Sequence, residues 1–287
     1  MKRRLKNLLL MGLILIFVVV AIFPVYYMIV TSFKTQSEVY SIRPSLIPFV
    51  DYQPTLEAWR MAFGFNKQAS GVSGQIFSAT RNSLTDALFG ALLSVLMGSA
   101  VAYGLTRFSY GRIKNENISF FILAQRMFPP VALAMPYYVL FLRAGMTDKN
   151  LTMVLVYAAM NIPLVTWMLS DFFKDVPVEI EEAAMVDGMT RIGIFFQIVV
   201  PMVVPGIFVA FLFSFAFSWN EFLYALTLTF NKAKTLPFQI AGMVSHSGPR
   251  YAEIAAQATY VMIPMLVIEI AANKYIVRGL SAGALKS

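Results

Sequence analysis

The chain has 287 residues, of which 58% are hydrophobic and only 13% are charged, and its mean hydropathy is +0.67. Because soluble globular domains carry roughly 25% charged residues, this composition excludes a soluble fold, a disordered chain and a coiled coil. The absence of cysteine excludes a disulfide scaffold and a thiolate metal site, and the single histidine, His246, is expected in a surface loop without a chemical role. The formal net charge of +8 is more typical of basic residues that flank membrane spans than of nucleic-acid binding.

Six apolar stretches are long enough to cross a membrane. A spanning helix needs about 20 mostly apolar residues, because each residue rises about 1.5 Å through a hydrocarbon core about 30 Å thick. The first stretch follows four basic residues but exceeds the roughly 7–15 apolar residues of a signal peptide, so we expect a retained anchor. The sequence therefore predicts one all-α integral membrane domain with spans at 8–30, 83–104, 118–142, 151–173, 201–226 and 257–277.

Basic residues predict the orientation of these spans. Arg107, Arg112, Lys114 and Arg278 flank span ends in segments that would be cytoplasmic if the N-terminus is inside. The outer loops carry basic residues too, but the loop 31–82 is long, and long loops count less. We therefore expect a multi-pass protein with both termini in the cytoplasm.

The outer loop before the second span carries a helical pattern. Leu56, Trp59 and Phe63 recur at helical spacing, which predicts a short amphipathic helix. Such a helix either lies in the membrane interface or packs as a turn against the bundle. Asn82 and Ser83 then supply a predicted N-cap for the second span.

The longest inner loop, 174–200, has the pattern of a helix, a sharp turn and a second helix. Pro177 suits a first helical turn, and the three glutamates that follow it lie where the helix dipole favours negative charge. Gly188 fits the left-handed residue after a helix end. Thr190 can cap the second helix, and Pro201 can open the fifth span.

One face of the first loop helix is made of small residues. Ile180, Ala183 and Ala184 share this face at spacings of three and four residues, so another surface could approach it closely. An ordinary amphipathic loop helix would show the same physical features, and the residue pattern alone leaves both interpretations open.

The segment from Glu182 to Pro201 resembles the EAA loop of ABC importer permeases, in sequence and in its place between the fourth and fifth of six spans. Val200 stands where that family has leucine. The matching positions are Glu182, Ala183, Ala184, Gly188, Ile198 and Pro201. Other segments resemble the second permease of maltose-type carbohydrate importers: Asn82-Ser83-Leu84, Pro129-Pro130, Trp219-Asn220-Glu221-Phe222 and Tyr275-Ile276-Val277-Arg278-Gly279-Leu280.

The resemblance implies a type I ABC importer permease bundle whose EAA helix docks, as a coupling helix, in a groove of an ATPase subunit. Glu182 would meet a basic or helix-N-terminal partner, and Gly188 would set the turn that transmits ATPase closure. The implied coupling residues are Glu182, Ala183, Ala184, Asp187, Gly188 and Pro201. ATP and Mg would be bound by the partner, because this sequence has no phosphate-binding loop. The chain itself would then be no enzyme and would hold no cofactor or metal.

By the same resemblance, the chain would translocate a sugar, oligosaccharide, polyol or glycoside across the prokaryotic cytoplasmic (inner) membrane. The implied partners are a second, non-identical permease, an ATPase dimer and an extracytoplasmic solute-binding protein, with lipid around the spans and no nucleic acid. The alternative is an ion-coupled secondary transporter that uses Arg126, Glu221 and Glu269 as a relay. Such a carrier would have no use for the inner helix–turn–helix loop.

Two charges are predicted inside the membrane. Arg126 and Glu269 both lie about 12 Å from the inner boundary, in the third and sixth spans. An unpaired charge at this depth costs several kcal/mol, so such groups normally face the bundle interior or a wet cavity. As part of an inner gate, Arg126 would pair with Glu269 or with a polar group of a partner permease. In the alternative, Arg126 extends toward the interface and Glu269 meets Lys274.

Several polar side chains in the spans are candidates for the translocation pathway. Trp219, Asn220 and Glu221 lie near the outer third of the fifth span, where they could contact sugar hydroxyls or could hold helices together. Weaker candidates in the fourth span are Tyr157, Asn161 and Trp167. Finally, Pro129, Pro130 and Pro136 predict a break in the third span, whose freed carbonyls must be satisfied by protein or by a wet cavity.

Overall fold

The computed structural model describes residues 2–43, 45–65, 76–111, 113–245 and 248–284, so His246 lies outside the described residues. The predicted all-α fold is confirmed, with one small antiparallel hairpin of β1 (Val244–Ser245) and β2 (Gly248–Pro249). The chain forms two compact units. The first unit comprises Met1–Phe77 with Gln239–Pro264, and the second comprises Ser78–Phe238 with Met265–Ser287.

Four helices of the described part are long and apolar enough to cross a membrane, namely α1 (Lys2–Thr31), α4 (Ile76–Arg107), α7 (Asn150–Lys174) and α14 (Tyr251–Ala284). Two further candidates are bent. The segment of α5 (Asn115–Ala124) and η2 (Gln125–Met127) meets α6 (Pro130–Arg143) at 89°, and Arg191–Met202 meets α11 (Val204–Trp219) at 81°. The number of spans reaches the predicted six if each bent pair crosses the membrane once.

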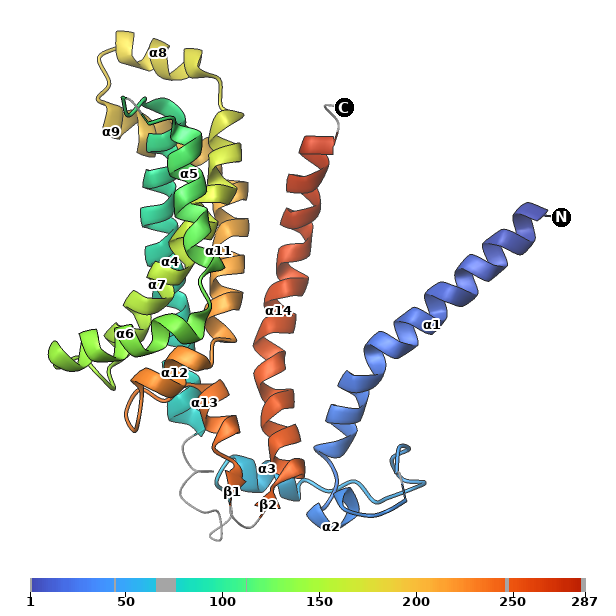
Figure 1. Ribbon diagram of the computed structural model, residues 1–287. Helices are drawn as coiled ribbons and strands as arrows, with labels where there is room; N and C mark the ends of the chain where they lie inside the picture. The colour runs from blue at the N-terminus through green and yellow to red at the C-terminus, as the bar shows by residue number, and fades with distance from the viewer. Residues whose placement is uncertain (1, 44, 66–75, 112, 246–247, 285–287) are drawn as a thin grey trace. The chain divides into compact units, whose positions relative to one another are not determined.

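The shorter elements lie between these helices. They are α2 (Gln36–Val39), α3 (Glu57–Ala62), α8 (Val178–Val186), α9 (Arg191–Ile194), the π-helical turn η3 (Phe195–Val199), α10 (Val200–Met202), α12 (Leu223–Leu228) and α13 (Leu236–Ala241). In the second unit, α4, α5, α7 and α11 run alongside one another, and α8 lies at one end of them (Figure 1).

Small residues let α4 approach α7 closely. A Cβ atom added at Gly90 would lie 2.8 Å from the Cβ of Tyr157, and one added at Gly98 would lie 2.7 Å from a methyl group of Val165. Both distances are shorter than van der Waals contact. Close backbone approach of this kind is how helices associate in lipid, where burying apolar surface gives no advantage.

The predicted break in the third span is confirmed. Phe128 is extended, and α6 begins at Pro130 with Pro129 as its N-cap, because the residue before a proline is disfavoured in helical conformation. Pro136 lies inside α6 instead of at the break.

The fifth span is also less continuous than predicted. Its straight helix, α11, begins at Val204, three residues after Pro201, because the chain bends at Val203. The helix ends at Trp219, and α12 is a separate element that starts at Leu223. A continuous helix over 201–226 is therefore not present.

In the first unit, the outer loop helix packs against its own chain. Ala58 and Ala62 of α3 are buried against Ala252 and Ala256 of α14. Trp59 packs against aromatic rings of the same unit, at ring-centroid distances of 5.9 and 6.0 Å. The packed alternative is thus observed, and the buried face of the helix is formed by its alanines.

The predicted N-cap role of Asn82 and Ser83 is wrong, because α4 already begins at Ile76. Both side chains are buried and bind the loop after α12 instead. The Asn82 amide donates to the carbonyls of Lys232 (2.8 Å) and Lys234 (3.0 Å), and the Ser83 hydroxyl accepts from the Leu236 N–H (2.8 Å).

The same loop folds around one carboxylate. Asp148, between α6 and α7, accepts hydrogen bonds from four successive backbone N–H groups, those of residues 230–233, at 3.0–3.1 Å. Partial burial acts to raise the pKa of Asp148, but these four donors together outweigh it and hold the pKa below its ordinary value. One side chain therefore connects the α6–α7 loop to the loop after α12.

We expect Asp148→Asn to lower the free energy of unfolding by about 1–2 kcal/mol at neutral pH, because charge-assisted bonds are replaced by weaker neutral ones. Since the folded-state pKa is depressed, the contribution of Asp148 is fully present above an unfolded-state pKa of about 4 and is lost as the pH falls through the folded-state value. Thermal unfolding in detergent between pH 3 and 7 measures both effects. Asp51→Asn is the control, because this exposed carboxylate accepts comparable bonds from the N–H groups of Leu46 and Ile47. Equal losses for the two variants would contradict the assignment.

Candidate functional site

The inner loop forms the predicted helix, turn and second helix. Pro177 is the N-cap of α8, and Thr190 caps α9 by accepting from the N–H of Gly193 at 3.2 Å. Gly188 has a φ of +86°, the left-handed conformation that the sequence predicts. Around it, the N–H of Gly188 bonds to the carbonyl of Met185 and the next N–H bonds to that of Ala184, which is the Schellman arrangement of a helix end.

A buried ion pair attaches α8 to the end of α4. Nε of Arg107 lies 2.6 Å from Oε1 of Glu181, and the two side chains are only 8% and 7% exposed. The Tyr103 hydroxyl donates to the other carboxylate oxygen at 2.6 Å. Both oxygens of Glu181 thus have a partner from α4.

Arg107 also holds the end of α7. Its second guanidinium nitrogen donates to the carbonyls of Phe173 (2.9 Å) and Val176 (2.8 Å), which lie where α7 ends and the chain turns toward α8. Three segments therefore converge on one guanidinium: the end of α4, the end of α7 and the first turn of α8. In the following text we call Tyr103, Arg107 and Glu181 the clamp.

Apolar side chains surround the clamp. Ala184, Ile194 and Phe195 of the loop belong to the same buried cluster as Phe173 and Val199. The ring of Phe195 lies 4.9 Å from that of Tyr103 between centroids. This dry surrounding makes the ion pair strong, and it would make either charge costly alone.

The clamp divides the predicted coupling residues into two groups. Glu182, Ala183, Asp187 and Gly188 are exposed, whereas Ala184 is 6% exposed and faces its own chain. Ala183 and Ala184 therefore do not share one contact face, because Glu181 and Ala184, three residues apart, form the inward side of α8. Pro201 lies in α10 and is exposed.

The clamp is not evident from the sequence. By sequence, Arg107 is a charge that flanks a span, and Glu181 is a charge near a helix start. Both residues lie near the end of a predicted helix, which is a weak signal for a contact. Opposite charges 74 residues apart do not identify a pair without the fold.

The pathway candidates also divide into buried and exposed residues. Tyr157, Asn161 and Trp219 are buried, at no more than 2% exposure. The Asn161 amide donates to the Ser214 carbonyl (3.3 Å) and the Ser218 hydroxyl (3.0 Å), so it links α7 to α11. In this conformation Asn161 therefore holds two helices together, and Tyr157 and Trp219 are part of the buried interior.

Asn220 and Glu221 lie at the end of α11. The Asn220 side chain is in an exposed position and donates to the Ala216 carbonyl at 2.9 Å. The Glu221 carboxylate accepts from the N–H groups of Tyr224 (2.8 Å) and Ala225 (3.2 Å), and so caps the start of α12. Of the six pathway candidates, Asn220 and Trp167 are the two that are exposed.

The predicted gate residues are not paired in this conformation. The ion pairs among the described residues include neither Arg126 nor Glu269. The Arg126 guanidinium lies over the ring of Phe217, 4.7 Å from its centroid, and Glu269 is exposed. Pairing of the two residues stays a prediction for another conformation.

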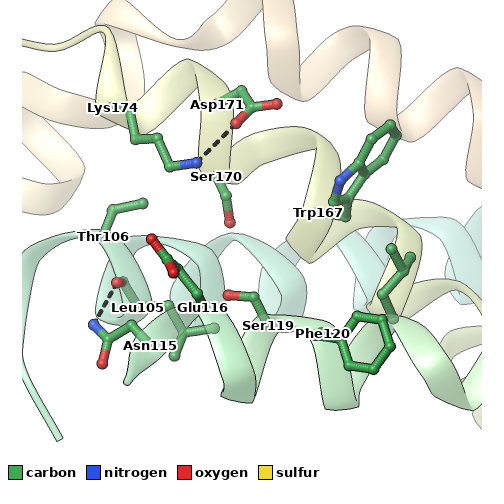
Figure 2. A pocket seen from close by; sticks show the side chains of 11 residues that line it. Leu105, Thr106, Asn115, Glu116, Ser119, Phe120, Trp167, Ser170, Asp171 and Lys174 are labelled. Carbon is green, nitrogen blue, oxygen red and sulfur yellow. Dashed lines mark hydrogen bonds and ion pairs between the residues drawn. The ribbon is translucent and has the colours of Figure 1, made fainter.

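A cavity of about 350 Å³ lies beside the inner ends of α4, α5 and α7. Figure 2 shows Lys174 turned toward Asp171, with which it forms an exposed ion pair at 3.0 Å, and Asn115 donating to the carbonyl of Leu105 at 2.7 Å. Trp167 is the one pathway candidate in its wall. No group of three or more potential metal ligands occurs within the part of the chain that the structure describes.

The sequence of this chain is similar to those of known transport proteins. A model of the family of binding-protein-dependent transport system inner membrane components matches residues 90–281. The permease protein SmoH of the sulfoquinovosyl glycerol transport system of Agrobacterium fabrum is 31% identical over 94% of this chain and 91% of its own. The permease protein MalG of the trehalose/maltose transport system of Thermococcus litoralis is 30% identical over 98% and 97%.

Solved structures share the fold. A chain of the bacterial ABC transporter that imports the acidic polysaccharide alginate superposes with a TM-score of 0.74 at 20% identity, covering 95% of this chain and 96% of that one. A chain of the MetNI methionine ABC transporter, in an inward-facing conformation, superposes with a TM-score of 0.57 at 16% identity, covering 72% and 96%.

We expect removal of one clamp charge to destabilise the protein by about 3–5 kcal/mol, because Glu181→Gln or Arg107→Met leaves the other charge buried and unpaired. The double variant Arg107→Met/Glu181→Leu should lose clearly less than the sum of the single losses. A double-mutant cycle of unfolding free energies in detergent measures this coupling.

The exposed pair Asp171–Lys174, whose side chains are 69% and 66% exposed, is the matched control. Its removal should cost at most about 1 kcal/mol. Additive losses at Arg107 and Glu181 would show that the clamp does not act as a unit.

Proposed function

Since the chain belongs to the family of binding-protein-dependent transport system inner membrane components, we propose that it is a permease of an ATP-driven importer for a sugar, oligosaccharide, polyol or related glycoside. Family members are transport components, so the chain is a membrane transport subunit and not an enzyme. The observation that carries the proposal is the α8–turn–α9 loop, which presents Glu182, Ala183 and Asp187 outward from a buried clamp. The transport systems named for SmoH and MalG support a carbohydrate substrate.

The outward face of α8 is the proposed docking surface for an ATPase subunit. Val186 is 87% exposed between the polar residues Glu182 and Asp187, so the face combines an apolar contact with two carboxylates. The small side chain of Ala183 would allow the wall of a groove in the ATPase subunit to approach α8 closely. Ala184, on the inner side, would carry force from α8 to the core of the chain.

ATP and Mg would be bound by the partner ATPase dimer. A second, non-identical permease would complete the pathway, and an extracytoplasmic solute-binding protein would deliver the substrate. With α8 on the cytoplasmic side, both termini are cytoplasmic. The alginate transporter that resembles this chain has also been solved with a periplasmic protein that carries alginate pentasaccharide, which supports the solute-binding protein as a partner.

The substrate pathway would pass the outer end of α11. Asn220 is the proposed substrate contact there, with Glu221 and Trp219 holding the surrounding backbone and Tyr157 and Asn161 fixing α7 against α11. An Arg126–Glu269 pair would form in a different stage of the cycle as an inner gate.

The substitution Gly188→Val separates this proposal from an ion-coupled carrier. A β-branched residue at a positive φ costs about 1–2 kcal/mol and would distort the turn behind α8. An importer should lose most of its transport and its substrate-stimulated ATP hydrolysis while the complex still inserts. A secondary carrier should retain transport.

Gly145→Val is the matched control. Gly145 has a φ of +63° at the end of α6, the same two closing hydrogen bonds as Gly188, and open space where a Cβ would lie. Transport measured in proteoliposomes should fall much less for Gly145→Val than for Gly188→Val. Equal losses would mean that backbone strain alone, and not coupling, explains the effect.

The composition of the complex is the most direct test. Native mass spectrometry of the tagged chain, purified gently from its own membrane, should show one second permease and two ATPase copies. A lone chain or a homodimer without ATP hydrolysis would contradict the proposal and favour the ion-coupled alternative.

A further inference from the structure

Arg126 is a cation without a charge partner at the break of the third span. It lies in η2, two residues before Phe128, and roughly 16 Å along the helix from Asn115, which is about half the depth of a bilayer core. The side chain is half-buried. The ion pairs and hydrogen bonds recorded for the described residues give it no acidic partner, and its one recorded contact is the ring of Phe217.

That ring does not balance the charge. A cation–π contact contributes about 0.5–2 kcal/mol, whereas an unpaired charge at membrane depth costs several kcal/mol unless it faces a wet cavity or a partner. The ring face also leaves the five guanidinium N–H donors available. Phe217 therefore fixes the position of a group whose hydrogen-bonding capacity is unused.

Arg126 lines a cavity. A space of about 150 Å³ lies between η2, α6, α7 and α12, lined among others by Gln125, Arg126, Tyr137 and Tyr224. This volume holds several water molecules, and therefore one charged substituent of a larger substrate. The Tyr137 and Tyr224 rings are 5.6 Å apart between centroids.

One residue of the cavity wall has a carbonyl without its α-helical hydrogen bond. Pro163 of α7 has no N–H, so the carbonyl of Ala159, four residues earlier, lacks its helical hydrogen bond, and both residues line the cavity. Arg126 thus shares its cavity with Gln125, Tyr137 and Tyr224, whose side chains are of types that can hydrogen-bond sugar hydroxyl groups.

We infer that Arg126 determines substrate specificity and that the imported glycoside carries an anionic group, a carboxylate, sulfonate or phosphate, which binds Arg126 as it passes the break in the third span. The inference rests on the proposed function. An acidic side chain of the second permease is the rival partner for Arg126. The cavity favours the substrate, because a fixed ion pair between subunits needs neither open space nor the polar groups at Gln125 and Ala159.

The test uses the intact transporter, with both permeases and the ATPase, in lipid nanodiscs without nucleotide. Saturation-transfer difference NMR would compare glucuronate with glucose and galacturonate with galactose, which are pairs that differ in the carboxylate. We expect at least one uronate to bind at least tenfold more tightly than its neutral hexose. Arg126→Gln should abolish this preference, Arg126→Lys should keep part of it, and Arg143→Gln, at the exposed end of α6, should leave it unchanged.

Equal binding of the paired sugars to the wild-type transporter, or no binding of either, would overturn the inference. A preference for the uronate that survives Arg126→Gln would also overturn the inference, and so would a preference that Glu269→Gln removes. Failure of the Arg126→Gln variant to assemble with the second permease would favour the rival partner. ATP hydrolysis stimulated by the binding protein, measured on the same preparations, distinguishes failure of this inference from failure of the proposed function. If it persists while the sugar preference is absent, the proposed function stands and the inference fails; if the complex has no ATPase at all, the proposed function fails.

Discussion

The buried ion pair between Arg107 and Glu181 connects the membrane part of this protein to its inner loop. The helix α8 has only nine residues, and short helices are marginal in water without tertiary packing, so α8 depends on this pair and on the burial of Ala184. The pair converts a surface loop into part of the core, because Tyr103 and the carbonyls at the end of α7 satisfy the remaining hydrogen-bonding groups. The outward face of α8 is therefore presented by a rigid base.

This arrangement gives each side of α8 a separate role. Glu181 and Ala184 contact the chain itself, and Glu182, Ala183, Val186 and Asp187 remain available to a partner. A helix that is attached on one side and free on the other can transmit a push without deforming. Motion of a partner that binds the free side would reach α4 and α7 together, since Arg107 is the last residue of α4 and bonds to the carbonyls at the end of α7.

The sequence was most informative where local chemistry decides the structure. The left-handed Gly188, the Thr190 cap and the break at Pro129 and Pro130 were predicted because each depends on the backbone preferences of one or two residues. The clamp, the loop around Asp148 and the inward side of α8 were not predicted, because each joins residues distant in sequence. Asn82 illustrates the difference: its capping propensity was evident, but the structure uses its amide for a loop about 150 residues later.

The helix pair α4–α7 is fixed along its whole length. Arg107 holds its inner end, Gly90 and Gly98 bring the two backbones together in the middle, and near the outer end the Asn150 amide donates to Asp86 at 2.8 Å. Separating the two helices would therefore break contacts at three levels. A change of shape would break fewer contacts at the places where helices are already interrupted, at residues 128–129, 203 and 220–222. The interruptions in the third and fifth spans are thus the positions where the chain could bend while α4 and α7 keep their mutual contacts.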